Sequence, residues 1–361
     1  MATKKVRKDY RISPTVHWII FTVLISIVAY FAWPDSSIPI DQLLRDARKS
    51  YQRAEFEGAL LSTGRILRCE PENPDALWIS GRSHARLKAY TDAVRDLELI
   101  ALNSPDGIDA RLLVAEILHY HLSLFDDAEQ AYSAVLRENP ANPDANDGMA
   151  RLLSVCGRRS EAIPLILRLV QLQKASDLLM VVARESGAIN DEDLLARAHR
   201  AAPDSAGPLL GLARLADLKH QTDEAVTLCQ RAVEKSPESV AVHIELGRYL
   251  LQLQRHEELN DWQRNLPPDA KLSPEIHSLI GFVELHDGHR TEALKLFLSA
   301  AKSLPDSRNL CHKISQLLFA AGDPEAAQLY VDQMENIRQL YDAQDRVLFA
   351  SGQPSPESML K

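Results

Sequence analysis

The segment HSLIGFVELHDGHRTEALKLFLSAAKSLP, residues 277–305, has a spacing of small and helix-ending residues that recurs through most of the chain. Gly281 lies in its first half and Ala293 in its second half, and small residues at these places let two helices approach closely. Pro305 ends the second half, because proline has no backbone N–H to donate and cannot continue a helix. The segment predicts two close-packed helices joined by a turn at 286–289.

Three markers of this pattern stay in phase along the chain. The alanine of the second helix recurs at Ala59, Ala93, Ala128, Ala162, Ala225, Ala293 and Ala327. The closing proline recurs at Pro71, Pro105, Pro140, Pro203, Pro237 and Pro305. The small residue of the first helix recurs at Ala47, Gly81, Ala150, Ala213, Gly247 and Gly281. The alanine intervals are 34 or 35 residues, apart from one of 68 and one of 63. A period near 34 residues predicts an array of helical repeats.

These spacings resemble the tetratricopeptide repeat (TPR), a helix-turn-helix unit with the pattern W-x₂-L-G-x₂-Y…A-x₃-F…P. His277 and Glu284 replace the aromatic residues of that pattern, whereas the small-residue frame is intact. The resemblance implies an all-α, right-handed TPR superhelix (α-solenoid) of about nine repeats over residues 40–335. The repeats are expected at 40–73, 74–107, 108–142, 143–175, 176–205, 206–239, 240–272, 273–307 and 308–335.

Helix starts and irregular repeats refine this frame. First helices are expected to begin with an N-cap side chain before a proline at Asn73-Pro74, Asn142-Pro143, Ser273-Pro274 and Asp323-Pro324. Second helices are expected to begin at the caps Thr91, Ser160, Thr222 and Thr291. Repeat five is five residues short and repeat seven ends early at Pro267-Pro268, so the curvature is expected to change there. A separate capping helix is expected at 336–350 and a polar tail at 351–361.

The N-terminal segment predicts a membrane anchor. Residues 1–15 carry five basic side chains and one acidic side chain, and residues 16–33 form an apolar run flanked by aromatic residues. The 17 residues from Val16 to Ala32 would span about 26 Å as a helix, close to the thickness of a bilayer core. A cleaved signal peptide is the alternative, but the run is long and Tyr30 and Phe31 crowd its exit. Residues 34–39 would be an extended linker.

Charge predicts the orientation of this anchor and limits the partners. The basic residues before the span should stay in the cytoplasm, which places the repeats outside it, although the reverse orientation is not excluded. Without residues 1–15 the chain has 36 basic and 49 acidic side chains, a net charge of −13. An acidic body disfavours nucleic acid as a partner. The expected location is therefore the cytoplasmic (inner) membrane, single-pass.

No pattern of catalytic, cofactor-binding or metal-binding residues stands out. The chain lacks phosphate-binding, dinucleotide-binding, H-E-x-x-H and C-x-x-C motifs. Cys69, Cys156, Cys229 and Cys311 lie far apart and are expected at helix-packing positions. His286 and His289 lie in a turn that offers too few ligands for a metal. We therefore predict a protein that is not an enzyme.

Arginine follows the small residue of the first helix in five repeats, at Arg48, Arg82, Arg151, Arg214 and Arg248. In TPR proteins the first helix lines a concave groove, so the resemblance implies that these side chains face a partner. A row of guanidinium groups would suit carboxylates on a peptide. The alternative is local ion pairing, for which Asp147 and Asp217 are placed close to Arg151 and Arg214.

The predicted function is a membrane-anchored TPR scaffold or adaptor that binds protein or peptide partners. Membrane-anchored TPR proteins of bacterial envelopes look similar in layout. The alternative is a chaperone-like or quality-control accessory of protein secretion or envelope assembly.

Overall fold

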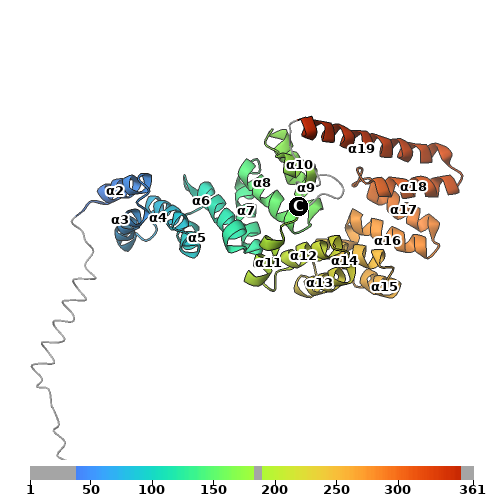
Figure 1. Cartoon of the computed structure of the whole chain (residues 1–361), viewed down its shortest axis with the longest axis horizontal. Coiled ribbons are helices and arrows are strands. Elements are labelled where there is room, and N and C mark those ends of the chain that lie inside the picture. The colour runs from blue at the N-terminus through green and yellow to red at the C-terminus, as the bar shows by residue number, and fades with distance from the viewer. Residues whose placement is uncertain (1–37, 183–188, 351–361) are drawn as a thin grey trace, which may run out of the picture. The chain divides into compact units, whose positions relative to one another are not determined.

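A computed structural model describes residues 38–182 and 189–350, and every element in these two ranges is a helix. The chain divides into two compact units, one ending at Ala110 and one beginning at Arg111, inside helix α6 (Gly107–Glu116). The first unit contains α2 (Ile40–Gln52), α3 (Phe56–Cys69), α4 (Pro74–Arg86), α5 (Tyr90–Glu98) and the start of α6. Figure 1 labels these helices from blue to turquoise.

The second unit continues from the rest of α6 through a π-helical turn, η1 (Ile117–Leu122). Its further helices are α7 (Phe125–Glu138), α8 (Pro143–Val155), α9 (Arg159–Gln171), α10 (Asp177–Val182), α11 (Glu192–Ala201), α12 (Ala206–Leu218), α13 (Thr222–Lys235), α14 (Val240–Gln252), α15 (His256–Arg264), α16 (Pro274–His286), α17 (Arg290–Ala301), α18 (Arg308–Ala320) and α19 (Pro324–Ala350). A single 3₁₀ turn, η2 (Ala270–Leu272), follows α15. Consecutive helices pair as the repeat frame predicts, so the all-α fold of helix-turn-helix repeats is confirmed.

Glycines allow the close approach of paired helices, as the small-residue markers predict. A Cβ atom added to Gly81 of α4 would lie 2.5 Å from Cγ of Leu97 in α5, and one added to Gly281 of α16 would lie 2.6 Å from the Phe297 ring in α17. Ala293 is fully buried. We expected Gly281 to face Ala293, but the atoms nearest to it belong to Phe297, one helical turn later.

The predicted N-caps of the first helices are confirmed. The side chains of Asn73, Asn142 and Ser273 accept hydrogen bonds from the backbone N–H three residues later, and each precedes a proline at the first helical position. Asp323 accepts in the same way from Ala326. These caps satisfy backbone donors that have no partner within the helix.

The caps predicted for the second helices are wrong. Helix α5 begins at Tyr90, one residue before Thr91, and its N-terminus has no side-chain cap. The turn is instead closed from the preceding helix, where Lys88 takes the left-handed conformation (φ 62°) and the N–H of Ala89 donates to the His84 carbonyl. Such a turn satisfies the last carbonyl groups of the first helix. Ser160 and Thr291 likewise lie one residue inside α9 and α17, and Thr222 is the first residue of α13, with no side-chain cap before it.

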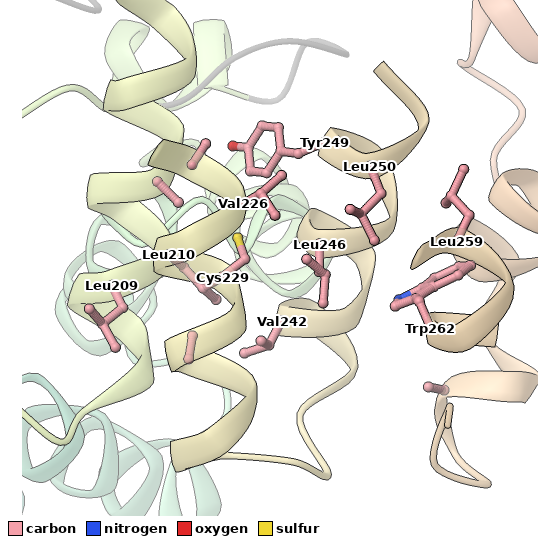
Figure 2. Packing of buried hydrophobic residues seen from close by; sticks show 14 of the residues in the cluster. Leu209, Leu210, Val226, Cys229, Val242, Leu246, Tyr249, Leu250, Leu259 and Trp262 are labelled. Atoms are coloured by element: carbon pink, nitrogen blue, oxygen red, sulfur yellow. The ribbon is translucent and has the colours of Figure 1, made fainter. Parts of the chain in front are cut away.

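The core of the second unit runs between successive helix pairs. Figure 2 shows Val226 and Cys229 of α13 next to Leu246 of α14, with Trp262 of α15 beyond α14. Tyr249 of α14 is fully buried in the same cluster. Cys156, Cys229 and Cys311 are buried, as expected for packing positions, whereas Cys69 is exposed, which corrects the prediction for that residue.

Elements on either side of the fifth repeat are in contact. A Cβ atom added to Gly211 in α12 would lie 2.8 Å from the carbonyl oxygen of Val155 in α8, and Ser205 donates to Asp126 of α7 at 2.9 Å. Farther along the chain, Arg159 at the start of α9 pairs with Asp306 after α17 at 2.9 Å. The second unit therefore has contacts between repeats that are not sequence neighbours.

Several expectations concern the two ends of the array. Residues 336–350 do not form a separate capping helix, because they continue α19, a single helix of 27 residues. The predicted membrane segment at 16–33 and the polar tail at 351–361 lie outside the described residues. Within 38–182 and 189–350, no helix combines the length and the apolar character needed to cross a bilayer.

Candidate functional site

The five arginines that we predicted as a partner-binding row have different environments. In the first unit, Arg48 pairs with Asp75 at 2.6 Å, and both side chains are about half exposed. Arg82 lies over two aromatic rings instead, 4.7 Å from the Tyr51 centroid and 5.1 Å from the Trp78 centroid. Cation–π contacts of this kind stabilise a partly buried guanidinium group without a carboxylate.

In the second unit, the internal pairing predicted for Arg151 is confirmed and that for Arg214 is wrong. Arg151 donates to Asp147 at 2.6 and 3.3 Å. Arg214 donates to the backbone carbonyl of Ile189 at 2.8 Å and leaves its buried Nε without a partner among the described residues. Asp217 accepts instead from Thr222 at 2.9 Å. Burial lowers the pKa of Arg214, an effect that the charge of Glu245 opposes.

Arg248 also has an internal partner. It pairs with Glu245, donates to the Tyr249 hydroxyl at 3.0 Å, and its guanidinium carbon lies 4.6 Å from the centroid of that ring. Burial acts to lower the pKa of Arg248, but the charge and hydrogen bond of Glu245, together with Tyr249 and Asp217, raise the pKa overall. Three of the five arginines thus have carboxylate partners within their own unit, and a partner-binding role for the row stays a prediction.

A hollow of about 490 Å³ lies beside Arg151 and combines acidic with aromatic side chains. We call it the acid–aromatic pocket, and its lining residues are Glu116, Tyr120, Tyr132, Pro143, Asp144, Asp147, Gly148, Leu169 and Lys174. The buried residues Tyr132, Gly148 and Leu169 form its floor. Glu116, Tyr120, Asp144 and Lys174 are exposed at its rim.

The π-helical turn η1 shapes the rim of the pocket. The chain widens to a π-helix after Glu116 and ends it with Ser123 in the left-handed conformation (φ 57°). This turn buries His119 completely, whereas Tyr120 keeps 40% of its surface exposed. The two rings stack with centroids 4.0 Å apart. π-Helical turns inside α-helices occur frequently at functional sites.

At the floor of the pocket, the ring of Tyr132 packs directly against Gly148. A Cβ atom added to Gly148 in α8 would lie 2.4 Å from the ring of Tyr132 in α7, so only glycine fits there. The Tyr132 hydroxyl is buried and has no hydrogen-bond partner among the described residues. Burial raises the pKa of this phenol, so the hydroxyl stays protonated. A buried hydroxyl without a partner is uncommon, because its desolvation is not offset by a hydrogen bond.

The electrostatics of the pocket favour a positive charge. Burial raises the pKa of Glu116, and the nearby Asp144 carboxylate raises it further. Burial alone would lower the pKa of Arg151, but the hydrogen bond and the charge of Asp147, together with Tyr120 and Tyr132, raise it overall. The Arg151–Asp147 pair therefore neutralises itself, and the charges left in the pocket are Glu116, Asp144 and Lys174.

A second hollow of about 720 Å³ lies where Pro267 ends the short repeat seven. Its lining is Asn260, Gln263, Arg264, Leu266, Lys271, His277, Ile280 and Leu296. Arg264 pairs with Asp261 at 2.5 Å, and a His277 ring nitrogen lies 2.8 Å from the Lys271 carbonyl. The basic groups of this hollow are thus largely occupied, and we do not assign it a ligand.

The described residues contain no cluster of metal-ligating side chains. In the parts of the chain that the structure covers, no three His, Cys, Asp or Glu side chains gather closely enough to hold a metal ion. His119 and His121 face different environments, as their spacing predicts, one buried and one exposed. Sequence reasoning missed Glu116, Tyr120 and Tyr132, because no motif links them. One spacing in the sequence could have indicated that Tyr132 packs against Gly148. These two residues are 16 positions apart, as are Gly81 and Leu97, which also pack against each other.

Comparisons with known proteins agree with the repeat frame. The sequence profile of the tetratricopeptide repeat family matches residues 42–108 and 210–258. Cellulose synthase operon protein C of Pseudomonas fluorescens (strain SBW25) is 27% identical over 243 residues, an alignment that covers 59% of this chain and 18% of that protein. This chain therefore spans less than a fifth of the length of that relative.

Two solved structures illustrate the structural matches. A tetratricopeptide repeat protein from Parabacteroides merdae ATCC 43184 has 14% identity and a TM-score of 0.31, covering 77% of this chain and 98% of that chain. Human IFIT1, solved as a dimer with m7Gppp-AAAA, has 14% identity and a TM-score of 0.39, covering 86% of this chain and 71% of that chain. The profile matches at residues 42–108 and 210–258, together with the 34-residue frame of helix pairs, show that this chain contains tetratricopeptide repeats.

Proposed function

We propose that this chain is a non-enzymatic scaffold, held at a membrane by residues 16–33, whose second unit binds a protein partner at the acid–aromatic pocket. The TPR fold serves protein–protein interaction in general, and function within a fold is determined by its site residues. The observation that supports this proposal most is the pocket itself, which combines an exposed ring with two carboxylates and a buried hydroxyl that have no ion-pair or hydrogen-bond partner among the described residues. Pockets with a few convergent polar groups on an otherwise apolar floor are typical binding sites.

Site-specific photo-crosslinking tests the proposal. A benzoylphenylalanine residue replaces Tyr120 in the full chain, and the crosslinker is activated in intact membranes. The matched control carries it at Phe319 of α18, an aromatic residue with 50% exposure outside the pocket. We expect one defined protein to be captured from position 120 and not from position 319. Equal capture from both positions, or capture from neither, would contradict the proposal.

The second candidate is a chaperone-like accessory of secretion or envelope assembly. The similarity to cellulose synthase operon protein C favours it, since the name of that relative associates it with an operon for a polymer-synthesising enzyme. The two candidates differ in what the crosslinker captures. An accessory should capture unfolded or newly exported chains of many kinds, whereas a scaffold should capture a fixed, folded partner.

A further inference from the structure

We propose that the acid–aromatic pocket takes a single cationic side chain, a lysine or arginine, from a protein partner. This inference rests on the proposed scaffold function and adds the chemistry of the contact. It differs from the row of arginines in the sequence prediction, which would recognise carboxylates on a partner.

Charge is the first argument. Three carboxylates line the pocket, and only Asp147 has an ion-pair partner among the described residues. Glu116 and Asp144 lie close enough for the charge of Asp144 to raise the pKa of Glu116. A cation between them would relieve this repulsion, because an opposite charge nearby favours the ionised form of a carboxyl group. An anionic ligand would increase the repulsion instead.

The aromatic groups provide the second argument. Tyr120 presents an exposed ring at the rim, and the Tyr132 hydroxyl is buried at the floor with no hydrogen-bond partner in the part of the chain that the structure describes. An ammonium or guanidinium group is attracted to the face of a tyrosine ring. A cation in the pocket would also lie near the Tyr132 hydroxyl, whose dipole has no hydrogen-bond partner among the described residues.

The basic residues near the pocket do not already serve as this cation. Arg151 donates to Asp147 and to Ser176, at 2.6 and 3.2 Å. Lys174 is exposed at the rim and forms no ion pair in the part of the chain that the structure describes. The volume of 490 Å³ leaves room for one long side chain, whose methylene groups would lie against Leu169 and Pro143. Basic side chains commonly bury their apolar stems while the charged group keeps polar partners.

Binding of small side-chain analogues to the purified full chain tests this preference. The probes are the N-acetyl, N-methylamide forms of lysine, arginine, norleucine and glutamate, measured by isothermal titration calorimetry. We expect lysine or arginine to bind at least about tenfold more tightly than norleucine, which has a similar length without the charge. Whichever of the two binds better identifies the cation. Equal binding of norleucine, or tighter binding of glutamate, would overturn the inference.

Two variants locate the binding within the pocket. Glu116→Gln removes a rim charge, and Tyr132→Phe removes only the buried hydroxyl. Each should weaken binding of the cationic probe about threefold to tenfold while leaving the thermal unfolding midpoint near that of the wild type. The matched control is Glu138→Gln, the same change at an exposed position of α7 outside the pocket. The inference fails if Glu116→Gln and Glu138→Gln bind the probe equally well.

Crosslinking separates this inference from the scaffold function. With the crosslinker at position 120, the wild-type chain should capture its partner and the Glu116→Gln chain should capture much less. Full capture by Glu116→Gln would overturn the cation preference and leave the scaffold intact. Binding of the lysine probe that depends on Glu116, without capture of any partner, would instead overturn the scaffold function.

Discussion

The side chain of His119 lies in a buried, aromatic environment. Its ring is fully buried against Tyr120, Phe125 and Tyr132, with centroid distances of 4.0, 5.7 and 6.2 Å. Neither ring nitrogen has a hydrogen-bond partner among the described residues. Burial, together with the positive charge of Arg151, lowers the pKa of His119 to about 3. The side chain is therefore neutral at physiological pH.

This environment predicts a loss of stability in acid. The unfolded chain protonates His119 near its ordinary pKa of 6.5, whereas the folded chain does not protonate it until about pH 3. Between these values the unfolded state binds the extra proton, so stability falls as the pH falls. From pH 6.5 to 5, His119 should cost about 1–2 kcal/mol of unfolding free energy. Denaturant unfolding of the full chain at several pH values measures this loss.

The variant His119→Phe isolates this effect, because a phenylalanine ring suits the aromatic cluster and does not titrate. Its unfolding free energy should fall less between pH 6.5 and 5 than that of the wild type. His121→Phe is the matched control, the same change at an exposed position two residues later, and should keep the wild-type pH dependence. Identical slopes in the wild type and in His119→Phe would show that another group causes the acid loss.

The helix pair is the structural element on which the array is built, and its spacing depends on glycine. In the first unit, Gly81 of α4 lies against Leu97 and the Ala93 carbonyl of α5. Gly64 of α3 lies in open space, with nothing within 4 Å of an added Cβ. Glycine is therefore needed for helix packing at position 81, whereas at position 64 it makes no close contact.

Replacing each glycine with alanine should have opposite effects. Gly81→Ala places its Cβ 2.5 Å from Leu97 and should destabilise the first unit by about 1–3 kcal/mol through overpacking. Gly64→Ala, the control, should stabilise it by about 0.5–1 kcal/mol, because alanine loses less backbone entropy in a helix. Thermal and denaturant unfolding measure both changes. Equal stability of the two variants would show that α4 and α5 are not held as closely as the structure indicates.

At the scale of the whole molecule, the repeat array is not a simple chain of neighbours. Repeat proteins generally pack each unit only against the next. In the second unit, the ion pair of Arg159 with Asp306 joins repeat four to the end of repeat eight. Helix α12, with Ser205 at its N-terminus, also contacts α7 and α8. The second unit therefore contains contacts between repeats that do not follow one another in the sequence.

The membrane anchor predicted for residues 16–33 implies a topology for the whole chain. An alkaline phosphatase reporter fused after Lys361, active only outside the cytoplasm, should be active, because the basic residues before the span stay inside. The control replaces the five basic residues at 4, 5, 7, 8 and 11 with glutamate, which should reduce the reporter activity. Activity of a cytoplasmic reporter at the same position would refute the topology. Recovery of the full chain without detergent would refute the anchor.

Local features of the chain could be predicted from the sequence alone. The closing prolines and the N-caps Asn73, Asn142 and Ser273 act within one or two helical turns, so neighbouring residues suffice to specify them. The period near 34 residues is a pattern of the sequence itself. The packing role of Gly81 and Gly281 follows from the same frame. The all-α fold of tetratricopeptide repeats could be predicted because its pattern of small residues and prolines is visible in the sequence.

Other features depend on which helices meet in space. The acid–aromatic pocket joins Glu116, Tyr132 and Asp144 from three helices, and no spacing in the sequence brings them together. The carboxylate partner of Arg48 is 27 residues away, and Arg214 bonds a backbone carbonyl instead of the nearby Asp217. Side-chain partners at this range are set by the angle and offset of helix packing. The packing angle and offset result from many contacts acting together, so only the tertiary structure determines which side chains meet.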